Sequence, residues 1–415
     1  MDDYHDMYLT TDVLLLTDIF ESFLNRTRFG MEGCVEVYRN QAGASYDPDM
    51  LLMFERGIRG GITQAVHRYA KANSKYMGEQ YDLNEESSYL QYLDANNLYG
   101  WAMRQDLPTH GFKWLSNVEA FTEKWISKLV ADNKHGYILE ADINYPESLH
   151  DKHNDLPFLP ERKVVHKVEK LIPNLEHKRR TAAKNDFNKD FYKLMNLSVF
   201  GKTMKNLRNH HNTQLVTNEK KYTKLVMKPN FKGGNYFSSH LMGVEMGKTE
   251  AKMNKPVYIG QAILDMSKVV IHEFHYDYMQ PKYGSKLRIC YMDTDSFVYH
   301  IRTEDFYRDI ADDVEARFDT KANSKDDNRP LLIGKNKKVV GLMKDELNGK
   351  IMTEFINLRA KSMLTRVSRK RAVIAKRKEV NKLALNRADD KRIVQPDQIT
   401  TLARDHYRLA AKESK

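Results

Sequence analysis

The segment KLRICYMDTDSFVYHI, residues 286–301, decides the fold expected of this chain. Apolar residues alternate with other residues on both sides of an acidic centre, which predicts the two strands of a hairpin. Asp293 and Asp295 stand at its tip, two residues apart, so both side chains point the same way in an extended segment. Carboxylates in this arrangement favour a hard cation, magnesium or manganese. A purely polar hairpin turn is the alternative interpretation.

A site for two cations needs a third carboxylate from another strand. In SSYLQYLDANNLYGW, residues 87–101, the alternation predicts a strand that ends at Asp94. Two hard cations a few ångströms apart can activate an attacking hydroxyl and stabilise a leaving pyrophosphate. Asp94 is therefore the expected third acid of the site.

The composition indicates a basic chain. Lysine and arginine number 67 against 56 aspartates and glutamates, a formal net charge of +11, which favours a polyanionic partner such as nucleic acid. The two cysteines, Cys34 and Cys290, lie far apart, which argues for a reducing compartment and against a disulfide framework or a zinc finger. No run approaches the ~20 apolar residues of a membrane span. The polar N-terminus is not a signal peptide, so we expect an intracellular protein without membrane contact.

The remaining patterns mix helices and strands. Helical periodicity covers residues 10–26, 181–202 and 254–279, and a basic tail from Arg366 keeps an apolar stripe that predicts a further helix. Gly233 and Gly234 predict a turn between short runs. Strands and helices do not alternate regularly, so the expected class is α+β. The 415 residues suggest two or three domains.

Three motifs in one order carry a resemblance to a known family. YMDTDS (291–296) resembles motif C of the family B DNA polymerases, DANNLYGWAM (94–103) their motif A, and KLMNLSVFGK (193–202) their motif B. Three short elements also match: IRGG (58–61) resembles Y-x-G-G, LRAKSM (358–363) resembles Lys-x-Tyr, and YLTTD (8–12) resembles the third exonuclease motif. The chain is most similar to the protein-primed polymerases of Maverick/Polinton mobile elements and related viruses.

This resemblance implies a right-hand architecture with an antiparallel-sheet palm, helical fingers and a partial thumb. The expected parts are an exonuclease remnant (1–50), a first palm segment with motif A (51–172), fingers with motif B (173–207), an insertion (208–255), a second palm segment with motif C (256–350) and a partial thumb (351–415). The first two exonuclease motifs would lie upstream of Met1, which predicts a polymerase without proofreading. A stretch around residues 172–183 is shorter than in these relatives.

The resemblance also implies roles for residues. Asp94 and Asp295 would hold two Mg²⁺ or Mn²⁺ ions, with Asp293 in support, and Tyr99 would pack beneath the incoming sugar and exclude a 2′-hydroxyl. Lysines would bind the nucleotide's phosphates as point charges. The nucleotide-binding residues would be Leu98, Tyr99, Lys189, Lys193, Ser198, Phe200 and Gly201, and the DNA-binding residues Arg59, Gly60, Gly61, Tyr291, Thr294 and Lys361.

The implied partners are a DNA primer-template, deoxynucleoside triphosphates and, as a further candidate, a terminal priming protein, with the nucleus as the location. Several positions depart from the family pattern: Leu197 replaces an asparagine, Phe200 and Met363 replace tyrosines, and Ile58 replaces another tyrosine. These departures leave a second hypothesis open, a catalytically inactive DNA-binding remnant of a mobile-element polymerase. A reverse transcriptase fits less well, because Thr294 separates acids that are usually adjacent in those enzymes.

Overall fold

The computed structural model describes residues 47–116, 122–129, 135–158, 200–201, 203–204, 211–238, 240–247, 255–319, 336, 338–360, 362–369, 372–376 and 391–409. The chain divides into two compact units. The first consists of Met1–Gly57, Pro108–Asn133 and Phe187–Gln261, and the second of Ile58–Leu107, Lys134–Asp186 and Ala262–Lys415. The helix expected at 10–26, and residues 181–199 of the helix expected at 181–202, lie outside the described residues.

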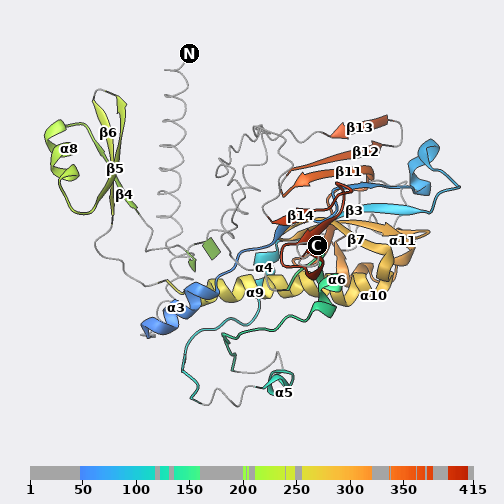
Figure 1. The fold of residues 1–415 in the computed structure, drawn as a ribbon, viewed down its shortest axis with the longest axis horizontal. Helices are drawn as coiled ribbons and strands as arrows, with labels where there is room; N and C mark the ends of the chain where they lie inside the picture. The colour runs from blue at the N-terminus through green and yellow to red at the C-terminus, as the bar shows by residue number, and fades with distance from the viewer. Residues whose placement is uncertain are drawn as a thin grey trace. The chain divides into compact units, whose positions relative to one another are not determined.

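The described part of the second unit contains a ten-stranded sheet (Figure 1). Its strands are β1 (Thr63–Ala65), β2 (Tyr69–Lys71), β3 (Ser88–Ala95), β7 (Leu287–Asp293), β8 (Ser296–Arg302), β9 (Phe318–Asp319), β10 (Met343–Asp345), β11 (Ile351–Arg359), β12 (Ser362–Arg369) and β13 (Ala372–Lys376). The order is β1-β7-β8-β3-β11-β12-β13, with β10 beside β3 and β2 beside β11. Its pairs are antiparallel except β9–β10. The expected α+β class is confirmed, and so is the hairpin at 286–301.

The neighbouring strands β3 and β8 are buried on both faces, because alternate residues serve two separate apolar clusters. Leu93 and Phe297 belong to one cluster, together with Phe274 from the helical segment that covers that face. Leu90 and Val298, from the same two strands, belong to the other. Strands covered on both sides need an apolar residue at nearly every position, which explains why SYLQYLDA and SFVYHIR are so rich in large side chains.

One long helix, α9 (Val257–Glu273), follows Pro256 and continues into the π-helical turn η4 (Phe274–Met279) and α10 (Gln280–Tyr283). Proline suits this place because the first helical residues need no amide donor. The helix expected at 254–279 is therefore confirmed. The shorter helical turns of this unit are η1 (Lys75–Gln80), α4 (Leu98–Ala102), η3 (Glu147–Leu149), α6 (His150–His153), η5 (Gly284–Lys286), α11 (Phe306–Asp309) and α12 (Val314–Arg317). Among the described helices, none combines the length and apolarity needed to cross a bilayer.

The basic tail contradicts one expectation. Residues 366–369 and 372–376, predicted to be helical, lie in strands β12 and β13, where Val367 pairs with Ile374. β-Branched residues fit a pleated surface well, and β11 offers β12 a partner strand that a helix could not use. Farther along, β14 (Arg392–Val394) and β15 (Thr401–Ala403) form a small hairpin. The assignment of 351–415 to a thumb stays a prediction.

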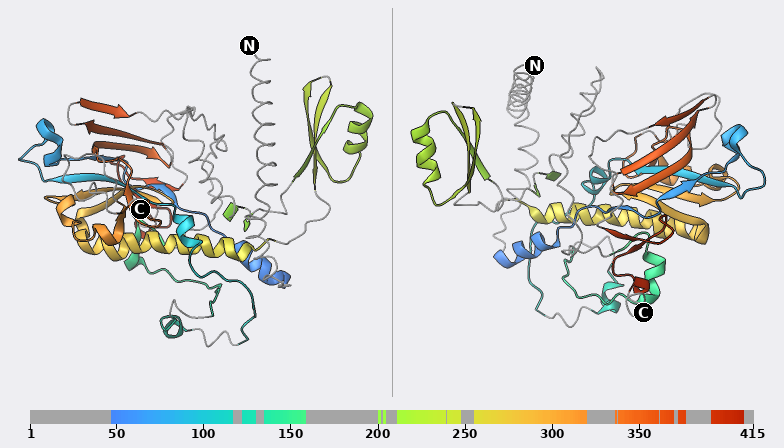
Figure 2. Two further views of the ribbon diagram at one scale, coloured as in Figure 1. Left: turned by 180° about the vertical axis from the view of Figure 1, so that it is seen from behind. Right: turned by 45° about the horizontal axis from the view of Figure 1, so that its top comes forward.

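The first unit contains a sheet of its own, formed by β4 (His211–Val216), β5 (Phe231–Ser238) and β6 (Leu241–Gly247) in the order β4-β6-β5. Helix α8 (Glu219–Val226) covers one face, capped by the Asn218 side chain, and Figure 2 shows this arrangement from two further sides. The predicted turn at Gly233 and Gly234 is wrong, because both residues lie inside β5. The Tyr222 hydroxyl of α8 lies close to Gly234. A Cβ added at Gly234 would lie 2.9 Å from that oxygen, so glycine fits here without a clash.

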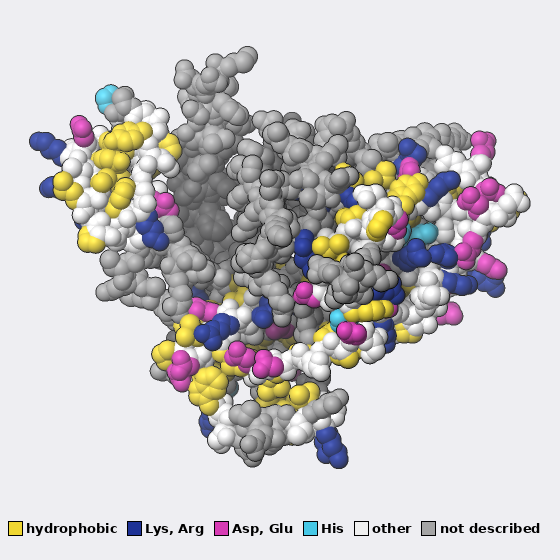
Figure 3. Space-filling view, in the orientation of Figure 1, with side chains coloured by type: hydrophobic (Ala, Val, Ile, Leu, Met, Phe, Trp, Pro, Cys, Tyr) yellow, Lys and Arg dark blue, Asp and Glu magenta, His cyan; other side chains and the backbone are white. Residues whose placement is uncertain are grey.

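The other described helices of this unit are α3 (Pro48–Gly57) and α5 (Glu123–Ile126). Apolar side chains gather on the surface of the β4-β6-β5 sheet, as Figure 3 shows in yellow. Leu215 and Phe237 are 64% and 62% exposed there, and the Phe237 ring lies over Gly243.

Candidate active site

Strand register places Asp94 beside the hairpin tip. Asp94 of β3 is opposite Ser296 of β8, and Asp293 of β7 is opposite the same serine. The amide of Ala95 donates a 2.7 Å hydrogen bond to the carbonyl of Asp295. The three acids therefore lie at one end of three neighbouring strands, although Asp94 is about 200 residues away in the sequence.

The tip itself is a tight turn centred on Thr294. The amide of Asp295 donates to the carbonyl of Asp293 over 2.6 Å, and Thr294 has a positive φ of 59°. That conformation is uncommon for a β-branched residue. The amide of Thr294 also donates to the carbonyl of Ile62 over 2.8 Å, which fixes the tip against the glycine-rich segment.

Gly61 of that segment has no room for a side chain. An added Cβ would lie 2.3 Å from Thr294 Cγ2, whereas one at the neighbouring Gly60 would meet nothing within 4 Å. Gly61 is therefore required by close approach to the tip. The IRGG element supports the acidic hairpin directly, a contact that the sequence did not reveal.

Two hydroxyl groups orient Asp293. Thr63 Oγ1 donates to Asp293 Oδ1 over 2.6 Å, and the Tyr291 hydroxyl donates to Asp293 Oδ2 over 3.3 Å. Thr63 is opposite Asp293 in the β1–β7 pair, and its own carbonyl accepts from Lys391 Nζ over 2.5 Å. Both carboxylate oxygens of Asp293 thus have fixed donors.

A lysine that the sequence analysis did not select lies beside Asp94. Lys344 of β10 is opposite Asp94, with Nζ 3.7 Å from Asp94 Oδ1, and it also pairs with Glu346. Burial acts to lower the pKa of Lys344, but the hydrogen bond and charge of Glu346 and the charge of Asp94 raise it above its ordinary value. A cation therefore stays beside the motif A acid at neutral pH. Nothing in the sequence LMKDE, residues 342–346, marks Lys344 as different from the chain's other lysines. Only the pairing of β10 with β3 places it beside Asp94.

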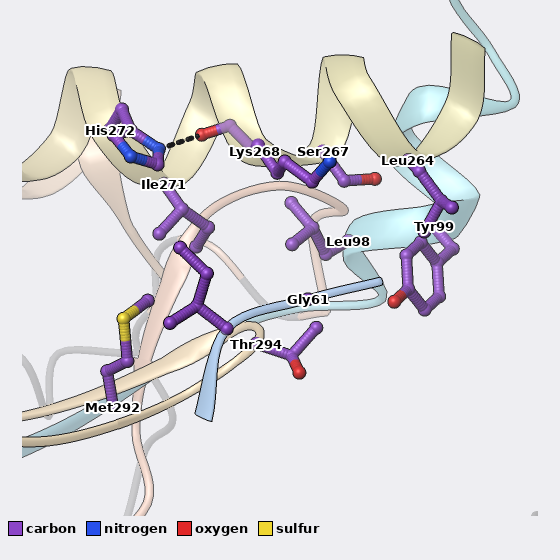
Figure 4. A pocket seen from close by; sticks show the side chains of 11 residues that line it. Gly61, Leu98, Tyr99, Leu264, Ser267, Lys268, Ile271, His272, Met292 and Thr294 are labelled. Atoms are coloured by element: carbon purple, nitrogen blue, oxygen red, sulfur yellow. Dashed lines mark hydrogen bonds between the residues drawn. The ribbon is translucent and has the colours of Figure 1, made fainter. Parts of the chain in front are cut away.

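Tyr99 closes a pocket next to the tip. Helix α4 begins directly after Asn97, whose φ of 44° turns the chain sharply after β3. Figure 4 shows the ring of Tyr99 and the side chain of Leu98 facing Gly61 and Thr294, with α9 across the pocket. Burial raises the pKa of Tyr99, and the negative charges of Asp295 and Asp293 raise it further. The phenol is thus neutral and close to both acids.

Helix α9 contributes polar residues to the same pocket. Ser267, Lys268 and His272 line it together with apolar residues of the helix. Lys268 Nζ lies 3.0 Å from Asp265 Oδ1, and His272 Nδ1 donates to the carbonyl of Lys268 over 2.8 Å, the dashed line in Figure 4. The sequence analysis did not select these residues. The feature of the sequence that could have identified them is that polar residues interrupt the apolar face of a predicted helix.

The structure supports the other predicted site residues less directly. Phe200 and Gly201 are helical and belong to the first unit, whereas the acids belong to the second. Arg59 and Gly60 are exposed, and Tyr291 is 2% exposed, so its ring lies in the core. Lys189, Lys193, Ser198 and Lys361 lie outside the described residues.

Within the described ranges, no group of three or more His, Cys, Asp or Glu side chains is arranged to hold a metal ion. Comparison of the chain with protein-family models, with curated proteins and with solved structures finds no match.

Proposed function

We propose that this chain is a template-directed DNA polymerase that extends a DNA 3′ end by nucleotidyl transfer with two magnesium ions. One observation supports this proposal above the others: strand pairing brings Asp94 to the tip that carries Asp293 and Asp295. Tyr99 lies close to these acids, and the motif resemblance implies a sugar-contacting role for this residue. Manganese could replace magnesium, because both prefer carboxylate and phosphate oxygens.

The donor set is chemically suited to magnesium. Mg²⁺ keeps several waters and is usually held by one or two carboxylates together with substrate phosphates, so a complete protein cage is not needed. Asp94 and Asp295 would hold the ions. When bound, such ions neutralise charge on the reacting phosphates and lower the pKa of the attacking hydroxyl.

The chain's own residues would position the reactants. Thr63 and Tyr291 fix Asp293, so that this acid supports the tip instead of reorienting. The Tyr99 ring would lie under the deoxyribose and leave no room for a 2′-hydroxyl. Lys268, on the pocket wall, would place a cation near the triphosphate, in addition to the predicted Lys193.

The substrates proposed are a primer-template and deoxynucleoside triphosphates, and a terminal priming protein is a further proposed partner. We also propose a nuclear location, from the motif resemblance.

Primer extension tests the proposal. The purified chain would be given a labelled primer-template, four deoxynucleotides and Mg²⁺. We expect extension by the native chain and a loss of at least about 10³-fold in Asp295→Asn, because the variant loses a charged oxygen at the site of phosphoryl transfer. Asp106→Asn is the matched control, since Asp106 is exposed. Equal losses in both variants, or extension unaffected by Asp295→Asn, would contradict the proposal.

A second candidate function is an inactive DNA-binding remnant. The Lys344–Asp94 pair favours it, because a cation beside Asp94 competes with a metal ion. DNA binding without extension, in both Mg²⁺ and Mn²⁺, would support the remnant. Extension by the native chain would exclude it.

A further inference from the structure

A buried arginine in the second unit has hydrogen-bond donors without acceptors among the described residues. Arg68, between β1 and β2, is only 5% exposed, and its Nη1 donates to the carbonyl of Gln398 over 3.3 Å. Its Nε and Nη2 atoms are buried and have no hydrogen-bond partner among the described residues. Two unsatisfied donors on a buried cation are costly, so the arrangement calls for an acceptor.

The two unsatisfied nitrogens are not an arbitrary pair. Nε–H and one Nη2–H of a guanidinium point the same way, in one plane, and this edge matches two oxygens of a carboxylate or phosphate. The third nitrogen, Nη1, is the one that Gln398 uses. The two nitrogens of the two-pronged edge of Arg68 are therefore buried without an acceptor among the described residues.

Asn357 of β11 adds a third donor beside Arg68. Its amide donates to the carbonyl of Arg68 over 2.7 Å, which continues the β2–β11 register by one residue. Residues opposite each other in an antiparallel pair project from the same face, with Cβ atoms ~5 Å apart. Asn357 is fully buried, its Oδ1 accepts from the amide of Arg359, and its Nδ2 has no partner in the described part of the chain.

Asp397, which precedes Gln398, and Glu354, on the strand β11 beside Arg68, are both engaged elsewhere. Asp397, next to Gln398, accepts at Oδ1 from the amides of Ile399 and Thr400 and at Oδ2 from the Thr400 hydroxyl. Glu354 of β11 accepts from the Tyr69 hydroxyl and pairs with Arg366 over 2.7 Å. Neither acid forms an ion pair or hydrogen bond with Arg68, so these two neighbours do not neutralise its charge.

We propose that Arg68 and Asn357 form a binding site for an oxyanion, either a phosphate or a carboxylate group. Two oxygens of the anion accept from Arg68 Nε and Nη2, and one also accepts from Asn357 Nδ2. A single water is a poorer occupant, because it brings two donor hydrogens and no charge to a place that offers only donors. This inference is independent of the proposed polymerase activity.

Anion-dependent stability of the full chain tests the site. The thermal unfolding midpoint would be measured against increasing inorganic phosphate and, separately, acetate, with sodium chloride keeping the ionic strength constant. A ligand that binds only the folded state raises the midpoint in a saturable manner. If phosphate saturates the rise at a lower concentration than acetate does, the site binds a phosphate group. If acetate saturates it at the lower concentration, the site binds a carboxylate. Either result supports the site. No saturable rise with either anion overturns it.

Two variants make the test specific. Arg68→Lys keeps the charge but loses the two-pronged edge, so we expect the apparent Kd to rise at least tenfold. Asn357→Asp keeps Oδ1 and replaces the unsatisfied donor with a carboxylate oxygen that Arg68 can bind. We expect this variant to unfold at a higher temperature without added anion and to lose the response to it.

Asn235→Asp is the matched control, an exposed asparagine on β5 that undergoes the same change of charge. It should respond to anions within about twofold of the native chain, because a surface charge has little effect on a buried site. If Arg68→Lys does not fold, the native titrations and Asn357→Asp still decide. An Asn357→Asp chain that keeps the native anion response, or unfolds at a lower temperature than the native chain without anion, contradicts the proposal.

Discussion

Thr63 Oγ1 donates a 2.6 Å hydrogen bond to Asp293 Oδ1 across 230 residues of chain. Thr63 is in turn held through its carbonyl by Lys391, from the segment just before β14. The acidic tip is thus supported by the glycine-rich segment and by the C-terminal hairpin. Replacement of Thr63 should affect both stability and the orientation of Asp293.

Thr63→Val should lower the free energy of unfolding by about 1.5–3 kcal/mol, because a hydrogen bond to a partly buried charged acceptor is lost. Primer extension should also slow. Thr63→Ser, which keeps the hydroxyl, is the control and should stay near the native value. Urea unfolding of the three chains measures the difference. A Thr63→Val chain within about 0.5 kcal/mol of the native protein would show that the bond contributes little.

Gly61→Ala should destabilise the fold by about 1–3 kcal/mol, because its Cβ would lie 2.3 Å from Thr294 Cγ2. Gly60→Ala is the control, since its Cβ meets nothing within 4 Å. Adding Thr294→Gly removes the clashing methyl and suits the positive φ of that position. The double variant should therefore recover most of the loss in a double-mutant cycle of unfolding energies. Additive losses would contradict the contact.

Tyr99→Ala should weaken the discrimination against ribonucleotides. If the ring packs beneath the sugar, its removal opens space for a 2′-hydroxyl, and we expect the ratio of ribonucleotide to deoxynucleotide kcat/KM to rise at least about tenfold. Tyr99→Phe keeps the ring and should preserve the native ratio. Single-nucleotide incorporation measures both. An unchanged ratio in Tyr99→Ala would remove Tyr99 from the sugar site.

His275 should make the fold sensitive to acid. Burial, and then the charge of His272, lowers the pKa of His275 to about 3, and its Nδ1 is 3.1 Å from the Tyr299 hydroxyl. The unfolded chain takes up this proton below its ordinary pKa of about 6.5, whereas the folded chain stays neutral until about pH 3. The unfolded state therefore binds one proton more in that window, and stability falls as the pH falls.

The effect amounts to about 1.4 kcal/mol per pH unit for one histidine. Urea unfolding between about pH 6 and 4.5 should show a slope shallower by that amount in His275→Gln. His240→Gln, at an exposed position, should keep the native slope. Equal slopes in His275→Gln and the native chain would mean that His275 is already protonated in the fold.

Local sequence patterns correctly predicted those helices and strands whose tertiary contacts require the same spacing of apolar residues. The strand at 88–95, the hairpin at 286–301 and the helix from Val257 all followed from apolar spacing. Two expectations failed where distant partners decided the outcome. Val373 and Ile374 fit a helical stripe as well as a strand, and pairing of their segment with β12, which itself pairs with β11, selected the strand. Gly233 and Gly234 suited a turn locally, but pairing with Glu245 and Val244 of β6 holds them in β5.

The sequence by itself determined which acids to examine, because Asp293 and Asp295 are two residues apart in an alternating segment and Asp94 ends another. It could not determine that they meet. That depended on the register of β3 against β8, a pairing between segments about 200 residues apart. Strand pairing in the same sheet also places Lys344 opposite Asp94 and Thr63 opposite Asp293. Backbone hydrogen bonds set strand register through long-range pairing, so only the tertiary structure decided which side chains surround the acids.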